Sequence, residues 1–268
     1  MDVVNCGDVD PELTVIGGVH GDEPCGPEAI ETTLSSGSAL PIAARFIVAN
    51  EEALEHGARY VDADLNRVMP GDPDSDLHEV RLAARLHDAL GEAPVIDLHS
   101  TESFAEPFAT LPVVTPATAE LVRATGVDRA VAFSPPGGTS VLDCCTGIGV
   151  ECGLQGSDDA AANAYDIIQA ALTALGSDSV ARGRDDPVLY RMTGIVEKPE
   201  PYRLLVDNFE QVEQGEVFAE AVESGEELRA GEPFYPFLMS EQGYEDILGF
   251  QAERVGPLSD AVHHSTGV

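Results

Sequence analysis

Positive charge is scarce in this sequence. Lysine and arginine together number 14, and only Lys198 is a lysine, whereas aspartate and glutamate number 48, so the formal net charge is -34. A surface this acidic repels phosphate groups, and we expect neither nucleic acid nor an anionic membrane as a partner. Molar salt shortens the Debye length to about 3 Å and would remove most of the self-repulsion. The acidic residues are spread along the whole chain, which favours a high-salt cytoplasm over a docking surface for one cationic partner.

Paired cysteines and long apolar runs are also missing. The five cysteines are an odd number, and Cys144 and Cys145 are adjacent, which indicates a reducing compartment. No apolar run approaches the roughly 20 residues of a membrane-spanning helix, and residues 1–5 resemble no signal segment. These features predict a cytoplasmic protein, and they leave the oligomeric state open, homo-oligomers included.

Strand-like and helix-like segments alternate through the first two thirds of the chain, which is typical of an α/β domain with a parallel or mixed sheet. We expect strands at 13–19, 45–49, 95–99, 111–114, 130–133 and 147–152, and helices at 27–34, 76–90, 116–125 and 157–175. A polar segment at 177–187 then precedes short pieces broken by glycine and proline, which indicates a domain boundary. We therefore predict an α/β domain at 1–180 and a small β-rich domain at 181–268, whose last residues, 258–268, we expect to be frayed.

The first candidate site begins where an apolar strand leads into a His-x-x-Glu pair, His20 and Glu23. Another apolar strand ends on His99. Functional groups collect at the carboxyl ends of strands in open α/β sheets, so these three side chains can converge. Two imidazoles and a carboxylate form a ligand set used by catalytic zinc sites, with one position left for water. Asp97 either orients an imidazole or ends the strand without a role.

A second cluster contains Arg59, Asn66 and Arg67 in a chain that is poor in arginine. The guanidinium fork suits carboxylate recognition and can stabilise an oxyanion. The alternative is a structural loop in which Asp62 and Asp64 neutralise the two arginines.

A third candidate is Glu151, which lies inside an apolar strand. A carboxylate at such a position is costly unless it has a partner. Beside a metal-activated water it would be a natural general base, and the alternative is a structural ion pair.

In this order the motifs resemble those of the aspartoacylase and succinylglutamate desuccinylase family, which is related to the zinc carboxypeptidases. The matching segments are Gly18-Val19-His20-Gly21-Asp22-Glu23, Asp64-Leu65-Asn66-Arg67, Asp97-Leu98-His99-Ser100-Thr101, and Glu151 with Gly153. The resemblance implies a zinc carboxypeptidase-like fold, with a mixed sheet flanked by helices and a small C-terminal β-rich module that caps the site. It also implies one Zn²⁺ per chain, held by His20, Glu23 and His99.

The same resemblance implies roles for the remaining residues. Glu151 would be the base that activates water, and Arg59 would polarise the scissile carbonyl. Asn66 and Arg67 would hold the substrate α-carboxylate. In the tail, the segment around Tyr244 is similar to the family segment whose tyrosine reaches the active site, although this side chain could instead pack within the β-rich module.

The expected function is that of a zinc-dependent amidohydrolase that removes an acetyl- or succinyl-type group from a small N-acyl amino acid. Family members specific for acylated aspartate carry a further arginine shortly before the residue corresponding to Glu151, and residues 141–146 contain none. An acidic substrate side chain is therefore in doubt. The same catalytic set could serve a carboxypeptidase acting on short peptides, and a non-catalytic zinc- or ligand-binding protein of this fold is a further alternative.

Overall fold

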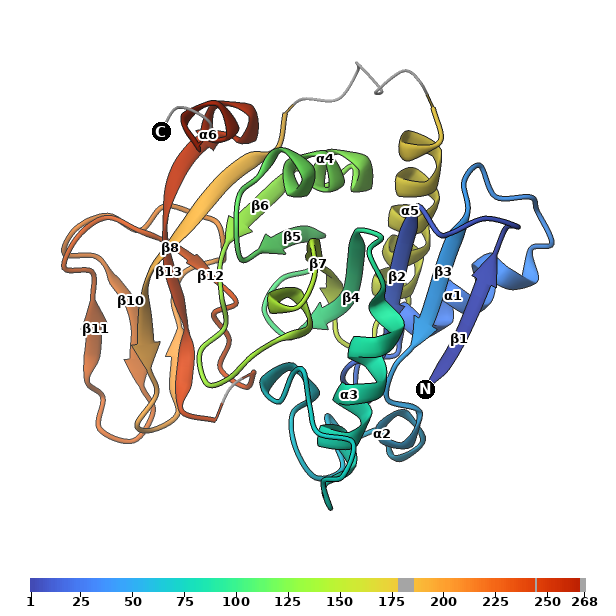
Figure 1. Cartoon of the computed structure of the whole chain (residues 1–268). Coiled ribbons are helices and arrows are strands. Elements are labelled where there is room, and N and C mark those ends of the chain that lie inside the picture. Colours follow the sequence, from blue (N-terminus) through green and yellow to red (C-terminus); the bar gives the residue numbers. More distant parts are fainter. Residues whose placement is uncertain (178–185, 244, 266–268) are drawn as a thin grey trace.

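A computed structural model describes residues 1–177, 186–243 and 245–265 of the chain. A ten-stranded mixed sheet lies at its centre, with a three-stranded antiparallel sheet at one side (Figure 1). In sheet order the ten strands are β1 (Asp2–Cys6), β3 (Ala44–Val48), β2 (Leu13–Gly17), β4 (Val95–Thr101), β7 (Gly147–Leu154), β5 (Phe108–Leu111), β6 (Arg129–Ala132), β8 (Val188–Glu197), β13 (Ile247–Pro257) and β12 (Tyr235–Phe237). The small sheet has the order β11 (Glu227–Arg229), β10 (Val217–Ala221), β9 (Tyr202–Leu204).

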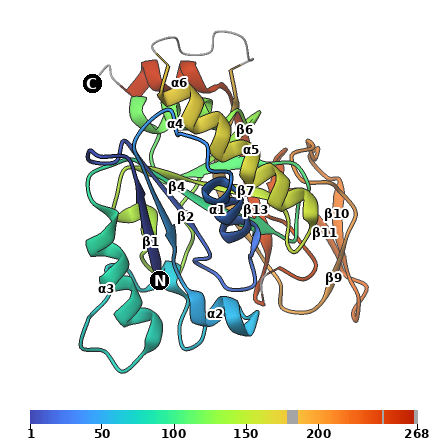
Figure 2. The same cartoon turned by 90° about the vertical axis from the view of Figure 1, so that its right-hand side faces the viewer.

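Helices cover both faces of the large sheet. They are α1 (Cys25–Ser35), α2 (Glu51–His56), α3 (His78–Leu90), α4 (Pro116–Thr125), α5 (Asp158–Leu175) and α6 (Leu258–Ser265), with short 3₁₀ turns η1 (Leu65–Arg67) and η2 (Val141–Asp143). The largest apolar core joins α1, α4 and α5 to one sheet face, and a second core joins α3 to the other. Figure 2 shows α3 and α1 on opposite sides of β2. No helix in the described residues is long and apolar enough to cross a bilayer.

The predicted α/β class and mixed sheet are confirmed. Each predicted strand and helix overlaps an observed one, and the ends are shifted for all but the helix at 116–125. Helix α4 has the predicted bounds because local signals fix both of its ends. Thr115 forms a capping box with Thr118, Pro116 occupies the first turn, and Gly126 ends the helix in the left-handed conformation. Strand β5 begins earlier than predicted, because the buried Phe108 already pairs with β7.

Three elements lie outside the sequence predictions. Strand β1 is an edge strand whose residues are half-buried or exposed, and α2 is a short helix of mostly exposed residues, so neither shows a strong apolar pattern. The prediction that residues 258–268 are frayed is wrong for α6. Its first residue, Leu258, is fully buried in the largest core, and this burial holds the helix on the sheet.

The C-terminal third contributes to both sheets. Strand β8 pairs in parallel with β6, and β13 pairs with β8, so this part of the chain extends the large sheet, while β9 to β11 form the small one. The predicted domain boundary at 180/181 falls within residues 178–185, which lie outside the described residues. The division into two domains stays a prediction.

Strand β7 separates the apolar core from the polar side of the sheet. Ile148, Val150 and Cys152 alternate along it and are buried in the largest core. Gly149 and Glu151 lie on the other face, beside Asp97 and His99 of the parallel neighbour β4. The period-2 alternation of a strand thus places Glu151 and His99 on the same face of the sheet.

Candidate active site

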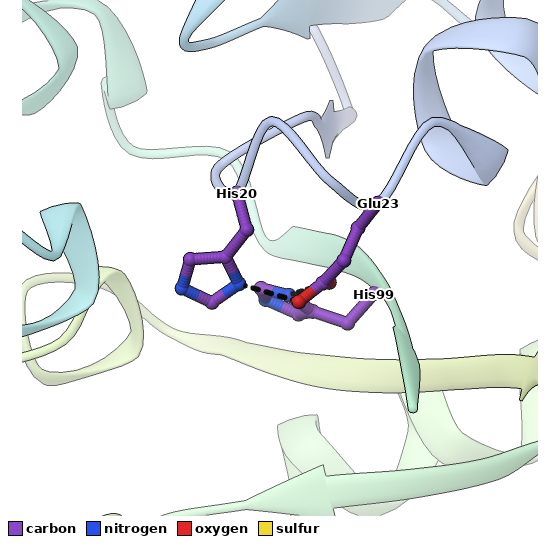
Figure 3. A group of neighbouring side chains, drawn as sticks. All are labelled: His20, Glu23 and His99. Atoms are coloured by element: carbon purple, nitrogen blue, oxygen red, sulfur yellow. Dashed lines mark hydrogen bonds and ion pairs between the residues drawn. The ribbon is translucent and has the colours of Figure 1, made fainter. Parts of the chain in front are cut away.

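Three potential metal ligands meet at the carboxyl ends of β2 and β4. His20 and Glu23 lie in the loop between β2 and α1, and His99 lies in β4, with ligand atoms of all three within 4.8 Å of one another (Figure 3). Glu23 Oε1 is 2.8 Å from Nδ1 of His20, and its Oε2 is 2.9 Å from Nδ1 of His99. The backbone N–H of Ser100 donates to Glu23 Oε2 at 3.1 Å. The structure therefore brings together the three residues that the sequence suggested.

The outer nitrogen of each imidazole faces a further carboxylate. Asp64 Oδ1 lies 3.2 Å from Nε2 of His20, and Asp97 Oδ2 lies 2.9 Å from Nε2 of His99. Acceptors at Nε2 favour the tautomer that carries its proton there, which leaves the Nδ1 lone pair for a metal. Two nitrogens, one carboxylate and two orienting acids fit Zn²⁺ by the chemistry of the donor set.

Mutual interaction shifts the pKa values of these groups. Burial lowers the pKa of His99, but the charges of Asp97 and Glu23 outweigh it and raise that pKa well above its usual value. Glu23 and Asp64 raise the pKa of His20 in the same way against the effect of burial. Burial raises the pKa of Glu23, yet the two histidines hold it well below its usual value. The site is therefore a tightly coupled group of opposite charges.

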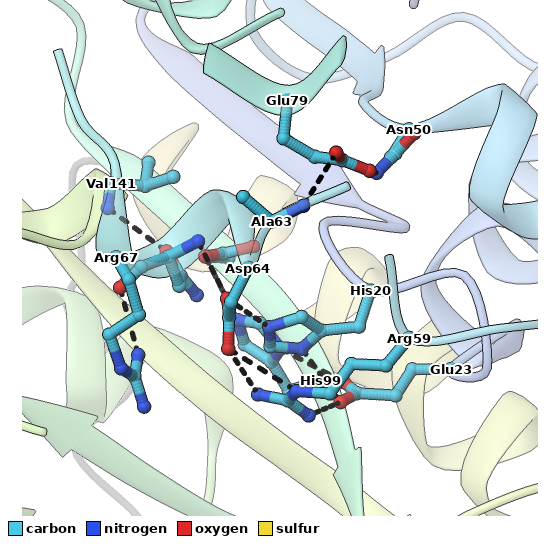
Figure 4. A network of polar contacts seen from close by, with 12 residues as sticks. His20, Glu23, Asn50, Arg59, Ala63, Asp64, Arg67, Glu79, His99 and Val141 are labelled. Carbon is cyan, nitrogen blue, oxygen red and sulfur yellow. Dashed lines mark hydrogen bonds and ion pairs between the residues drawn. The ribbon is translucent and has the colours of Figure 1, made fainter. Parts of the chain in front are cut away.

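Arg59 belongs to the same network (Figure 4). Its guanidinium lies 3.1 Å from Asp64 Oδ2 and 3.4 Å from Glu23 Oε1, and 38% of the side chain is exposed. Asp64 thus accepts from both Arg59 and His20, and its pKa is well below the usual carboxyl value, because these partners outweigh the effect of burial. From the sequence, Asp64 was expected as part of a family motif and as a neutralising partner for arginine, and its contact with His20 was not predicted.

Asn66 and Arg67 lie in η1, next to Asp64. The side chain of Asp64 accepts from the backbone N–H of Asn66 at 2.9 Å, which fixes the start of this turn. The Asn66 Oδ1 atom accepts from the backbone N–H of Val141 at 3.0 Å. This bond orients the amide group so that its NH₂ end is the donor available to a ligand. Both Asn66 and Arg67 line the cavity that contains the histidines.

Glu151 lines the same cavity and is the register partner of His99. Burial, and secondarily the charge of Glu23, raises the pKa of its carboxyl group to about 7. A carboxyl with a pKa near neutrality, beside potential metal ligands, can exchange a proton at physiological pH. The arrangement is suited to a general base.

Glu79 is a buried acid that the sequence analysis missed. It lies in α3 with no exposed area, and its carboxylate accepts from the backbone N–H groups of Val61, Asp62 and Ala63 at 2.6 to 3.0 Å. Asn50 donates to it as well, at 3.1 Å. Glu79 therefore fixes the loop between Arg59 and Asp64. The one sequence signal for this role was a glutamate on the apolar face of an amphipathic helix, in the first turn of that helix.

The cavity has a volume of about 180 Å³, below the roughly 300 to 1,000 Å³ of sites for drug-sized ligands, so it suits a small molecule. Leu238, Ser240 and Gly243 bring the C-terminal part of the chain into its wall. Tyr244, the remaining predicted site residue, lies outside the described residues.

Comparison with known proteins identifies the family of this chain. Residues 9–171 match the succinylglutamate desuccinylase/aspartoacylase catalytic domain. The chain belongs to this family. The matched residues include all of the predicted site positions except Tyr244.

The curated members of the family align with only part of the chain. An N-acyl-aromatic-L-amino acid amidohydrolase (carboxylate-forming) of Xenopus tropicalis is 33% identical over 114 residues, covering 37% of this chain and 36% of that protein. A succinylglutamate desuccinylase of Burkholderia orbicola is 37% identical over 141 residues, covering 45% and 41%. The aligned part thus spans less than half the length of these relatives.

Solved structures of the family share the whole fold. Murine aminoacylase 3 superposes with a TM-score of 0.74 at 24% identity, covering 92% of this chain and 97% of that one. A succinylglutamate desuccinylase/aspartoacylase from Rhodobacter sphaeroides gives a TM-score of 0.77 at 18% identity, covering 94% and 88%. The likeness extends well beyond residue 171, so it includes strands contributed by the C-terminal third.

Proposed function

We propose that this protein is a zinc-dependent amidohydrolase that releases an acyl group from an N-acyl amino acid. The observation that carries the proposal is the convergence of His20, Glu23 and His99 beside Glu151 in one small cavity. The family supports the reaction class, because the relatives include an N-acyl amino acid amidohydrolase and a desuccinylase.

His20, Glu23 and His99 would hold the zinc ion, with Asp64 and Asp97 fixing the two imidazoles. When bound, zinc would supply a Lewis acid and lower the pKa of water to about 7. The remaining chemistry falls to side chains of this chain.

Glu151 would act twice as a proton carrier. It first accepts a proton from the attacking water, as the new C–O bond forms at the amide carbon. It then delivers that proton to the amide nitrogen as the C–N bond breaks, which gives a carboxylic acid and a free amine. Burial raises the pKa of this carboxyl group above that of an exposed glutamate, which makes it a better proton acceptor from water.

Arg59, Asn66 and Arg67 would place the substrate for these steps. The Arg59 guanidinium, held by Asp64 and Glu23, can donate to the oxyanion that develops on the amide carbonyl. Asn66 can donate its amide NH₂, and Arg67 its guanidinium, to the α-carboxylate. A fixed carboxylate would set the distance between the scissile amide and Glu151.

Two alternatives make different predictions. A carboxypeptidase would cleave short peptides, which a cavity of about 180 Å³ accommodates less readily than an acylated amino acid. A non-catalytic zinc-binding protein would cleave neither class and would have no use for Glu151.

The deciding experiment measures amide hydrolysis in molar potassium chloride. N-acetyl and N-succinyl amino acids are compared with short peptides, before and after removal of zinc by a chelator. We expect release of a free amino acid that is lost with the chelator and returns with zinc. Preferential cleavage of peptides would favour the carboxypeptidase, and one bound zinc without any hydrolysis would favour the binding protein.

A further inference from the structure

Apolar side chains line the cavity next to Asn66 and Arg67, which form the proposed carboxylate anchor. The bond from Val141 N–H to Asn66 Oδ1 holds the η2 turn beside that anchor, and the next residue of the turn is Leu142. Leu142 lies over β7, with its δ-carbons 3.1 Å and 3.6 Å from the positions that a Cβ would take at Gly147 and Gly149. Glycine at position 147 therefore leaves space for Leu142, and at Gly149 a Cβ would be in ordinary van der Waals contact with the same side chain.

Next to Asp97, the register partner of Gly149 on β4, further uncharged side chains line the cavity. They are Thr110 and Pro112 from β5 and the residues that follow it, and Phe133 and Pro135 from the segment after β6. Thr110 is the register partner of Gly149, and its Oγ1 lies 2.6 Å from the Cβ position there. The side chain of an amino acid leaves the carbon that carries the carboxylate, so a substrate anchored at Asn66 would have its side chain within reach of this wall.

The charges of the cavity do not provide for a second anionic group. Arg59 and Arg67 are the two arginines among its described lining residues, and no described lysine lines it. Arg59 is within ion-pair distance of Glu23 and Asp64, and Arg67 belongs to the anchor. Among the described residues, the buried Asp97 Oδ1 lacks a hydrogen-bond partner. An acidic substrate side chain would add a negative charge here without a cation to balance it, which is costly.

The end of the cavity that adjoins a neighbouring groove is also unsuited to an anion. Asp22, Glu102, Gln155 and Ser240 line both the cavity and a larger groove of about 1380 Å³ beside β9. Five further charged residues line that groove, and four of them are acidic. They are Glu106, Asp207, Glu210, Glu241 and the basic Arg129. An acyl group that reached this end would meet acidic side chains, so a carboxylate on the acyl group would be repelled.

Resting on the proposed deacylase function, we propose that the substrate carries no charge except its α-carboxylate. Its side chain is apolar and lies against Leu142 and Phe133, over Gly149. Its acyl group is neutral and faces the acidic opening at Asp22 and Glu102. Leu142 and Gly149 are then the residues that determine side-chain specificity.

Kinetics on matched substrates test this proposal. N-acetyl-leucine, N-acetyl-aspartate, N-acetyl-lysine and N-succinyl-leucine are compared by kcat/KM in molar potassium chloride with zinc. We expect N-acetyl-leucine to exceed each of the other three by on the order of 100-fold. Preference for the aspartate, lysine or succinyl compound would overturn the corresponding part of the proposal.

A single substitution at Leu142 should shift the substrate preference from an apolar side chain toward an acidic one. Leu142→Arg places a guanidinium at the apolar wall, and we expect the kcat/KM ratio of N-acetyl-aspartate to N-acetyl-leucine to rise by on the order of 10- to 100-fold. Val222→Arg adds the same charge at a residue that is 66% exposed and lines neither cavity nor groove, and it should leave the ratio unchanged. An unchanged ratio in a folded Leu142→Arg protein would remove Leu142 from the proposed specificity site.

Binding to Glu151→Gln separates this proposal from the proposed function. Calorimetry on the zinc-loaded variant measures the dissociation constants of the same four compounds without turnover. Tighter binding of N-acetyl-leucine with no hydrolysis by the wild-type protein would refute the deacylase function and support the selectivity. Equal binding of all four compounds, or tighter binding of a charged one, would refute the selectivity even if hydrolysis occurs.

Discussion

Asp64 Oδ1 lies 3.2 Å from Nε2 of His20, and this contact joins two parts of the site that are 44 residues apart in sequence. The other oxygen of the same carboxylate accepts from Arg59 at 3.1 Å. A single acid thus orients a proposed metal ligand and the arginine proposed to stabilise the oxyanion. Metal binding and transition-state stabilisation are expected to depend on it together.

Asp64→Asn should weaken zinc binding by about 10- to 100-fold, because an amide neither accepts as strongly from His20 nor carries the charge that makes the imidazole a better ligand. Competition with a fluorescent zinc chelator measures the dissociation constant directly. Asp62→Asn is the control, because Asp62 lies in the same loop and is exposed. It accepts from the backbone N–H of His78 rather than from a proposed zinc ligand. Equal zinc affinity in the two variants would contradict the role of Asp64.

Glu151→Gln should lower kcat by about 10²- to 10⁴-fold, because glutamine cannot accept the proton of the attacking water. Zinc content, measured by mass spectrometry, should stay at one ion per chain, since Glu151 is not one of the three proposed zinc ligands. Retained activity with one zinc bound would show that another group is the base.

Arg59→Ala should reduce kcat by about 10²- to 10³-fold with little change in melting temperature, because a donor to the developing oxyanion is lost while 38% of the side chain is already exposed. Arg123→Ala is a matched control, since Arg123 is 34% exposed and pairs with Asp186 away from the cavity. A purely structural role for Arg59 would give the reverse pattern, with a lower melting temperature and unchanged turnover.

Glu79→Gln should lower the free energy of unfolding by roughly 2–4 kcal/mol at pH 7, because an amide cannot accept from three backbone N–H groups as the carboxylate does. Urea unfolding measures this difference. Glu55→Gln, at an exposed position in α2, is the control and should stay within about 0.5 kcal/mol of the wild-type protein.

The effect of Glu79→Gln should also depend on pH. Burial raises the pKa of Glu79, but its backbone and Asn50 donors outweigh this and lower it below the usual glutamate value. A depressed pKa contributes stability above the pKa of the unfolded chain, near 4.5, and this contribution is lost as pH falls through the folded value. The difference between wild type and variant should therefore shrink below about pH 4.5, and a pH-independent difference would contradict this account.

The thermal unfolding midpoint should rise with potassium chloride concentration, because a net charge of -34 makes the compact state repel itself. Most of the increase should occur below about 1 M, where the Debye length reaches about 3 Å. Calorimetric scans in potassium chloride from about 0.05 M to about 3 M provide the measurement, because the Debye length shortens over this range. A midpoint that is independent of salt would contradict an adaptation to high salt.

Features that depend on neighbouring residues could be predicted from the amino-acid sequence. The apolar segments that lead to His20 and His99, the alternation that places Glu151 on the cavity side of β7, and the caps of α4 are short-range patterns. Backbone hydrogen bonding and side-chain periodicity act over a few residues, so these patterns are legible without a structure. The strand-end positions were enough to suggest the potential metal ligands.

Contacts between side chains that are distant in sequence could not be predicted before the folded arrangement was known. The contacts of Asp64 with His20, of Glu79 with the 61–63 loop, and of Leu142 with the space above Gly149 all depend on strand order and on how loops are packed. Such pairings are selected by burial and charge compensation over the whole molecule, and a polar residue in a sequence does not indicate its distant partner. For the same reason the sequence could place Asp64 in a motif but not identify it as the link between His20 and Arg59.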